Sequence, residues 1–183
     1  MGPKAIGAAL GVVATLLVAI AVWLTVAYTG AYNVAATDTH ADAVRWTLDT
    51  TMRRSVASRA EDILLPGTVP QDMLAEGAQH YAASCAHCHG GPGVEPSEWS
   101  RGMRPEPPHL VEAAAEWEPK EIYWIAENGI KMSGMPAFGR HHGPEELLTI
   151  AAFVSQLPGM SPEDYATITS GDDGHGGNVA GSE

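Results

Sequence analysis

The chain contains only two cysteines, and both lie in the segment Cys85-Ala86-His87-Cys88-His89. Cysteines three residues apart lie on the same side of a helical turn, so both sulfurs can reach one ligand together. The histidine that follows brings an imidazole to the same place. A fold for this chain must therefore present these side chains to a single bound group, and the other elements must be arranged around that requirement.

The spacing C-x-x-C-H is typical of covalent haem attachment. Two thioether bonds from Cys85 and Cys88 would fix one porphyrin, and His89 would bind the iron as its proximal axial ligand. A structural zinc site is a poorer match, because His87 and His89 would have to complete a tetrahedron from within the same few residues. A thioredoxin-like redox pair needs a βαβ setting that the helical and Gly-rich flanks do not predict. We expect one covalent haem c.

The second axial position of the iron decides between an electron carrier and a haem enzyme or gas sensor. Met135 is the best candidate, because the glycine and proline on either side stiffen its loop and a neutral thioether favours ferrous iron. Met132 is the nearest rival, and His141 or His142 would give a bis-histidine iron instead. Closing both axial positions lets the iron change oxidation state with little rearrangement. This favours electron transfer over a haem peroxidase or a gas sensor.

The stretch from 90 to 108 is rich in glycine and proline and has no helical or strand period, which predicts a loop after the haem motif. Trp99, Arg101 and Arg104 lie in this loop. An indole N–H or a guanidinium there can bind a haem propionate, so we expect propionate contacts from Trp99 and Arg104 in particular.

Helical periodicity marks the rest of the domain. A stripe of small and apolar residues over 74–85 predicts a helix that leads directly into the cysteine motif. A short helix around 122–126 should stop at Asn128-Gly129, and a last helix should run from Gly143-Pro144 to Pro158-Gly159. No segment has a convincing strand period, so we expect an all-α fold.

The amino-terminal part of the chain has no charged residue from position 5 to position 28. As a helix this stretch would be about 36 Å long, enough to cross a hydrocarbon core of about 30 Å. Trp23 and Tyr28 suit the interface at its far end. A signal peptide cleaved near 34–36 is the alternative, but the apolar stretch is longer than the usual signal core of about 7–15 residues. We expect a retained, single transmembrane helix.

Residues 41–60 predict an amphipathic helix after the membrane span. Its apolar side chains recur every fourth residue, at Val44, Leu48, Met52 and Val56. This helix either lies against lipid headgroups or docks a partner subunit, or else it is a spacer packed on the domain that follows. Proline and glycine at 66–70 then predict a linker.

Charge is divided unevenly along the chain. Residues 1–60 carry five Lys and Arg against three Asp, a net charge of +2, whereas residues 61–183 carry five against nineteen Asp and Glu, a net charge of −14. Such an acidic surface repels nucleic acid and attracts a basic protein partner. The other explanation of the acidity is solubility or a salty habitat. In either case we expect no nucleic-acid partner.

Over residues 70–159 the chain resembles a class I c-type cytochrome. The matching residues are Gly77-x-x-x-Tyr81-x-x-x-Cys85-x-x-Cys88-His89-Gly90, then Asn128-Gly129-Ile130, Met135-Pro136 and Ala152-Phe153. The resemblance implies a cytochrome c fold around one covalently bound haem, with its first and last helices crossing at Gly77, Tyr81 and Phe153. It also implies that a proline carbonyl after the motif, that of Pro92, accepts the hydrogen bond of the His89 Nδ1–H. The Pro-rich loop 103–108 departs from the shortest family members.

The amino-terminal anchor is similar to that of membrane-bound, mono-haem bacterial members of this family. Haem attachment in the family occurs outside the cytoplasmic membrane, which implies a periplasmic haem domain and a cytoplasmic amino terminus. The resemblance implies a single-pass protein of the bacterial cytoplasmic membrane that transfers single electrons between respiratory or photosynthetic partners and is not itself an enzyme. A fixed electron-transfer subunit of a larger oxidoreductase complex is the alternative.

The predicted organisation has four parts. Residues 1–34 form the transmembrane anchor, and residues 35–69 form the juxtamembrane helix and linker. Residues 70–160 form the cytochrome c domain. Residues 161–183 form a flexible acidic tail, because they are rich in Gly, Ser and Asp.

Overall fold

The computed structural model describes residues 2–66 and 69–171, and the chain divides after Asp38 into two compact units. The first unit contains one long helix, and the second contains the remaining helices. Over the described residues the secondary structure is helical, apart from an isolated bridge between Gly91 and Val94. The prediction of an all-α fold is confirmed.

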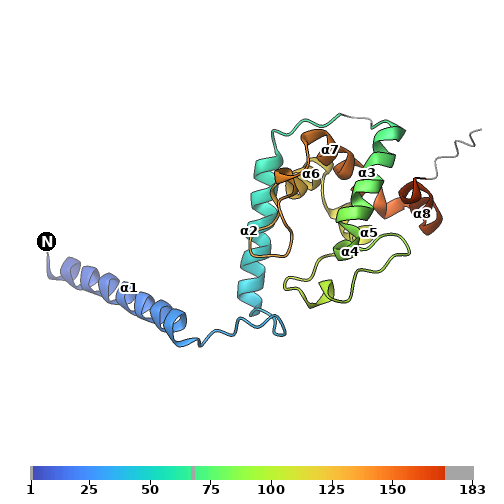
Figure 1. Ribbon diagram of the computed structural model, residues 1–183. Coiled ribbons are helices and arrows are strands. Elements are labelled where there is room, and N and C mark those ends of the chain that lie inside the picture. The colour runs from blue at the N-terminus through green and yellow to red at the C-terminus, as the bar shows by residue number, and fades with distance from the viewer. Residues whose placement is uncertain (1, 67–68, 172–183) are drawn as a thin grey trace, which may run out of the picture. The chain divides into compact units, whose positions relative to one another are not determined.

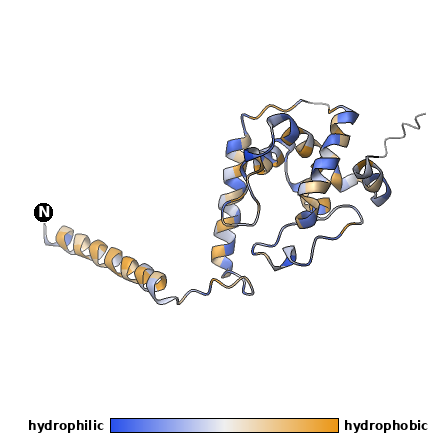
Figure 2. Cartoon of the chain, viewed as in Figure 1, coloured by the Kyte–Doolittle hydropathy of each residue, from blue (hydrophilic) through white to orange (hydrophobic). Residues whose placement is uncertain are grey.

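Helix α1 (Pro3–Thr29) forms the first unit. Proline in its first turn and a left-handed Gly30 after its last turn bound the helix at both ends. Beyond Lys4 in its first turn it is largely apolar, as Figure 2 shows, and it is long and apolar enough to cross a membrane. Its threonine hydroxyls donate to backbone carbonyls four residues earlier, so they need no water: Thr15, Thr25 and Thr29. The helix fits a single-pass anchor, although a signal sequence satisfies the same criteria of length and composition.

Helix α2 (Asp42–Ala60) belongs to the same compact unit as the cysteine motif. Its carboxyl-terminal half packs on α6 (Pro119–Asn128) through the fully buried Val56 and Ala60. Its amino-terminal half stays exposed, including the apolar Val44, Trp46 and Leu48. The second half of α2 therefore packs on the domain, as one of the predicted alternatives had it. The boundary that we predicted between residues 69 and 70 does not separate α2 from the domain, because both lie in one compact unit.

Arg53 connects α2 to the segment before α6 through an ion pair and a cation–π contact. The guanidinium of Arg53 lies 2.8 Å from Glu116 Oε2 and stacks 4.9 Å above the ring centroid of Trp117. Asp49, one turn earlier on α2, lies 3.4 Å from the same guanidinium. The hydrogen bond to Glu116, together with the negative charges of Glu116 and Asp49, raises the pKa of Arg53 above its ordinary value. The exposed pairs add little alone, but the stacked arginine fixes the rotation of α2.

The cytochrome-like region contains short helices linked by long loops (Figure 1). In chain order they are α3 (Gln71–Ser84), α4 (Ala86–His89), η1 (Ser100–Gly102), α5 (Leu110–Ala113), η2 (Ala114–Glu116), α6, η3 (Phe138–Arg140), α7 (Pro144–Val154), η4 (Leu157–Gly159) and α8 (Pro162–Ser170). Helix α3 crosses α7, and α6 packs on the same helix. The three helices predicted from periodicity are present, with α7 ending a few residues before the predicted stop at Pro158-Gly159.

The crossing of α3 and α7 is the tightest contact of the domain. A Cβ added at Gly77 would overlap the carbonyl oxygen of Thr149 and lie 3.1 Å from Cβ of Phe153. One turn along α3, the ring of Tyr81 lies 5.5 Å from that of Phe153, and both side chains are fully buried. Only a residue without a side chain allows this approach. The expected crossing at Gly77, Tyr81 and Phe153 is confirmed.

Helix α8 corrects the prediction of a flexible tail from 161 onwards. Ser161 caps this helix by accepting from the backbone N–H of Asp164 at 3.1 Å, and proline follows the cap. Tyr165 is 4% exposed and packs against Tyr81 and Phe153. One buried aromatic and a good cap outweigh the polar composition of the segment. The rest of the predicted tail, 172–183, lies outside the described residues.

Replacing Gly77 with alanine tests the crossing. A methyl group there improves helix propensity, but it overlaps the Thr149 carbonyl and forces α3 away from α7, so we expect a loss of about 1–3 kcal/mol in unfolding free energy. Gly102→Ala is the matched control, because nothing lies within 4 Å of its added Cβ. Denaturant unfolding of both variants makes the comparison. Equal midpoints for G77A and G102A would contradict the packing described here.

Candidate haem-binding site

The cysteine motif lies at the junction of α3 and α4. The backbone N–H of Cys85 donates to Tyr81 at 2.8 Å and continues α3, while those of Cys88 and His89 donate to the Cys85 carbonyl at 3.0 Å and begin α4. Gly90, with φ of 67°, then ends the turn. The two cysteines are free thiols and partly buried, and His89 is 9% exposed. Helix geometry therefore brings Cys85, Cys88 and His89 onto consecutive turns of one short segment.

The imidazole of His89 is oriented by a backbone carbonyl. Its Nδ1 lies 2.8 Å from the carbonyl oxygen of Pro108. A carbonyl can only accept, so Nδ1 carries the proton and Nε2 keeps its lone pair. Burial lowers the pKa of His89, and the bond to Pro108 offsets part of that effect. The ring is thus held neutral with one nitrogen prepared to bind a metal.

Pro108 replaces Pro92, which we predicted as the acceptor for His89. Pro92 lies in a tight turn closed by two hydrogen bonds between Gly91 and Val94, of 2.8 and 2.9 Å. This turn reverses the chain directly after the motif. The other end of the loop, at Pro108, is the part that reaches the His89 imidazole. The resemblance implied a proline carbonyl after the motif, and the prediction took the proline nearest to it. The prolines at 105, 107 and 108 were the available signal for a stiff returning segment.

The two thiols lack the electrostatics of a redox-active pair. Burial, with a smaller effect of Cys88, raises the pKa of the Cys85 thiol to about 12, and burial also raises that of Cys88. Reactive cysteine pairs depend on a lowered pKa that keeps a thiolate at neutral pH. The raised pKa values keep both cysteines as protonated thiols at neutral pH, and Cys85 packs against the apolar core.

A buried tyrosine holds the turn after the motif. The Tyr81 hydroxyl donates to the Gly90 carbonyl at 2.7 Å, and burial raises the pKa of this phenol. On the next residue, a Cβ added at Gly91 would lie 2.6 Å from the ring of Tyr165. Helices α3 and α8 therefore both press on the segment that follows His89. Sequence reasoning did not find the contribution of Tyr165, because its helix was expected to be disordered.

The loop that carries Met135 is fixed by its own backbone. The Met135 N–H donates to Ser133 Oγ at 3.1 Å, and its carbonyl accepts from Ile130 at 3.2 Å. Gly129, with φ of 66°, faces the Met135 carbonyl so closely that an added Cβ would lie 2.7 Å from it. Met135 is partly buried, whereas its rival Met132 is 74% exposed. The environment of the two side chains favours Met135 as the one that faces a bound group.

One loop joins the motif to the Met135 loop. At its carboxyl-terminal end, the Pro108 carbonyl binds His89. Earlier in the loop, Met103 packs close to Gly134: a Cβ added to Gly134 would lie 2.6 Å from the Met103 sulfur. The same loop carries the predicted propionate contacts. Arg101 pairs with Glu95 at 2.9 Å and Arg104 donates to the carbonyls of Arg101 and Met103, so both guanidiniums are already engaged.

The remaining candidates lie elsewhere. Trp99 is 59% exposed, with its indole available at the surface. His141 is exposed, and His142 lies beside His80 and Glu146. The structure thus does not place His142 among the residues of the cysteine motif.

Tyr81→Phe tests how the motif is held. Removing the hydroxyl leaves the buried Gly90 carbonyl without its partner, so we expect a loss of about 1–2 kcal/mol in unfolding free energy. Tyr123→Phe is the control, since its hydroxyl makes only a long, partly buried contact of 3.5 Å with Glu127, and its loss should change stability by less than about 0.5 kcal/mol. Thermal unfolding measures both. A smaller loss in Y81F than in Y123F would show that this hydrogen bond does not hold the turn.

The comparisons with known proteins agree with this geometry. Residues 72–154 match the family described as cytochrome C oxidase, cbb3-type, subunit III. Neither curated proteins nor solved structures give a significant match to the chain. The matched segment begins in α3, includes the cysteine motif and the Met135 loop, and ends with α7. The matched segment is therefore a c-type cytochrome domain, and such a domain implies haem binding and electron transfer.

Proposed function

We propose that the chain is a membrane-anchored, mono-haem cytochrome that carries single electrons between redox complexes on the periplasmic side of the bacterial cytoplasmic membrane. The observation that carries the proposal is the arrangement of two thiols and an oriented, neutral imidazole on one short turn. Cys85 and Cys88 would hold one haem covalently, and His89 would bind its iron. Met135 would supply the second axial ligand.

The chain's own residues prepare this site in three ways. The α3–α4 junction holds both thiols on one turn, so that attachment at one sulfur positions the other. Pro108 fixes the tautomer and the rotation of the His89 ring. Ser133 and Gly129 hold the Met135 backbone, so that this thioether needs little rearrangement to bind. When bound, haem supplies an iron that accepts and releases one electron.

The anchor and the expected site of haem attachment support the proposed location. Helix α1 would retain the protein in the membrane, and attachment outside the cytoplasmic membrane would place the second unit in the periplasm. An anchored carrier searches the membrane plane only, which raises its effective concentration for membrane partners. The acidic surface would attract a basic redox partner. Trp99 and Arg104 would contact haem propionates if their side chains turn toward them.

A fixed subunit of an oxidoreductase complex is the second candidate. It is supported by the family description, which names a subunit of cbb3-type cytochrome c oxidase. The exposed apolar half of α2 would suit a subunit contact. Extraction in mild detergent separates the two versions, because a carrier migrates alone on a native gel whereas a subunit migrates with its complex.

Replacing the cysteines tests covalent attachment. In a host that attaches haem to c-type cytochromes, we expect the wild-type chain to stain for haem after denaturing electrophoresis and to gain the mass of one haem. The double variant Cys85→Ala and Cys88→Ala should lose the stain completely, because no thioether bond remains. A wild-type chain that runs colourless and without added mass would overturn the proposal.

Met135→Ala tests the sixth ligand. The variant should keep its haem on denaturing gels, show a lower reduction potential, and take up carbon monoxide rapidly in the ferrous state, because a thioether favours ferrous iron and blocks the gas. Redox titration and carbon monoxide difference spectra measure these changes. Met132→Ala is the matched control, since this exposed methionine should leave both unchanged. If M132A and not M135A lowers the potential, the ligand is Met132.

A further inference from the structure

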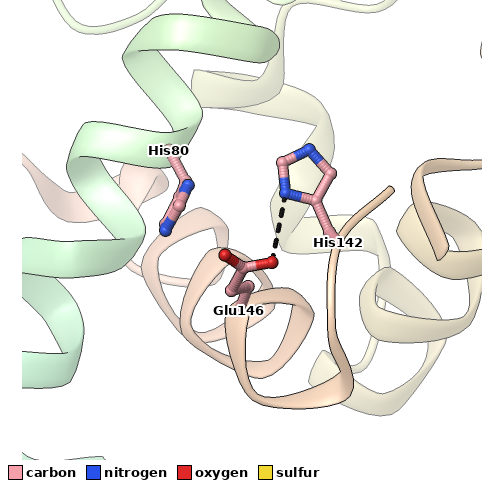
Figure 3. A group of neighbouring side chains, drawn as sticks. All are labelled: His80, His142 and Glu146. Atoms are coloured by element: carbon pink, nitrogen blue, oxygen red, sulfur yellow. Dashed lines mark ion pairs between the residues drawn. The ribbon is translucent and has the colours of Figure 1, made fainter. Parts of the chain in front are cut away.

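Two histidines and a glutamate from three separate segments meet outside the cysteine motif. His80 lies on α3, His142 follows η3, and Glu146 lies in the first turn of α7 (Figure 3). One ligand atom from each lies within 4.8 Å of the other two. None of the three residues belongs to the proposed haem site, which uses Cys85, Cys88, His89 and Met135.

The geometry of the cluster is near that of a metal site. The His142 Nδ1 lies 3.5 Å from Glu146 Oε2, as the dashed line in Figure 3 marks. Ligand atoms in a tetrahedral zinc site are about 3.3 Å apart when zinc–nitrogen bonds are about 2.0 Å long. Small side-chain rotations would therefore bring all three atoms within bonding distance of one ion. Glu76, one turn before His80 on α3 and 3.7 Å from its Nε2, provides a second carboxylate and so a fourth candidate ligand near the cluster.

The polar contacts around the cluster leave ligand capacity free. Glu146 Oε2 accepts from the Gly143 N–H at 2.8 Å and so caps α7, but Oε1 and the other lone pairs of the carboxylate are not needed for the cap. The side chains of His80, His142 and Glu146 are 29%, 19% and 40% exposed. They are buried enough to be held in place and open enough for an ion to enter from solvent.

We propose that His80, His142 and Glu146 form a binding site for a borderline divalent cation of the Zn²⁺ type. Two imidazole nitrogens and one carboxylate select zinc, copper or nickel over magnesium and calcium, which prefer oxygen ligands. Three protein ligands leave one position for water or for Glu76. The site is separate from the haem iron and does not depend on the assignment of its ligands.

The position of the site suggests what the ion does. His80 lies one turn beyond Gly77 on α3, and Glu146 lies one turn before Thr149 on α7, so an ion there would tie together the two helices that cross at Gly77. His142 follows the Met135 loop, and its ring lies 5.7 Å from that of Phe138. A bound ion would therefore stabilise the crossing and restrain the segment that follows Met135.

Zinc titration of the haem-loaded full chain in detergent, without a polyhistidine tag, tests the site. Isothermal titration calorimetry with Zn²⁺ alone should give one ion per chain, and thermal unfolding should move to higher temperature as Zn²⁺ is added. His142→Ala, His80→Ala and Glu146→Gln should each lower the affinity at least about tenfold and abolish the thermal shift. His141→Ala is the matched control, since it removes an exposed neighbouring imidazole outside the cluster.

Two results would overturn the proposal. One is no saturable zinc binding by the wild-type chain, and the other is equal affinity in H142A, E146Q and H141A, which would place the ion at other histidines. Unfolding midpoints measured without zinc show whether each variant is folded. If His80→Ala is not, His142→Ala and Glu146→Gln decide, because His142 lies in a loop and Gln keeps the size of Glu146.

Discussion

The close approach of α3 and α7 at Gly77 is the contact on which the domain depends. Because Gly77 has no side chain, the Thr149 carbonyl can lie against its Cα and the rings of Tyr81 and Phe153 can pack one turn away. Tyr81 in turn donates to Gly90 and so holds the turn that follows the cysteine motif. A single missing side chain on α3 is thus connected, through one aromatic pair and one hydrogen bond, to the segment that carries Cys85, Cys88 and His89.

The loop from the motif to α5 is the second constraint. It begins with a tight turn at Gly91 and Val94 and returns at Pro108, whose carbonyl fixes the His89 ring. Between these points Met103 contacts Gly134, beside Met135. The loop therefore links the two parts of the chain that supply the proposed axial ligands.

The sequence predicted the parts of the domain that depend on local patterns. The C-x-x-C-H spacing, the apolar stripe of α3 and the stop signal at Asn128-Gly129 each lie within a few residues, so helix geometry determines them. Long-range partners were harder. Pro108 could not be distinguished from Pro92, since the choice depends on where a 19-residue loop returns. Helix α8 was missed because one buried tyrosine outweighs a polar composition. The meeting of His80 with His142 requires the α3–α7 crossing itself.

Helix α2 is buried over one half of its length and exposed over the other. Val56 and Ala60 are buried on α6, and Arg53 stacks on Trp117 between them and the exposed half of the helix. The apolar period of α2 continues past this point to Val44 and Leu48, although the domain no longer covers it. Periodicity alone cannot show where coverage ends, because it reports which face of a helix is apolar and not how far a neighbouring element extends.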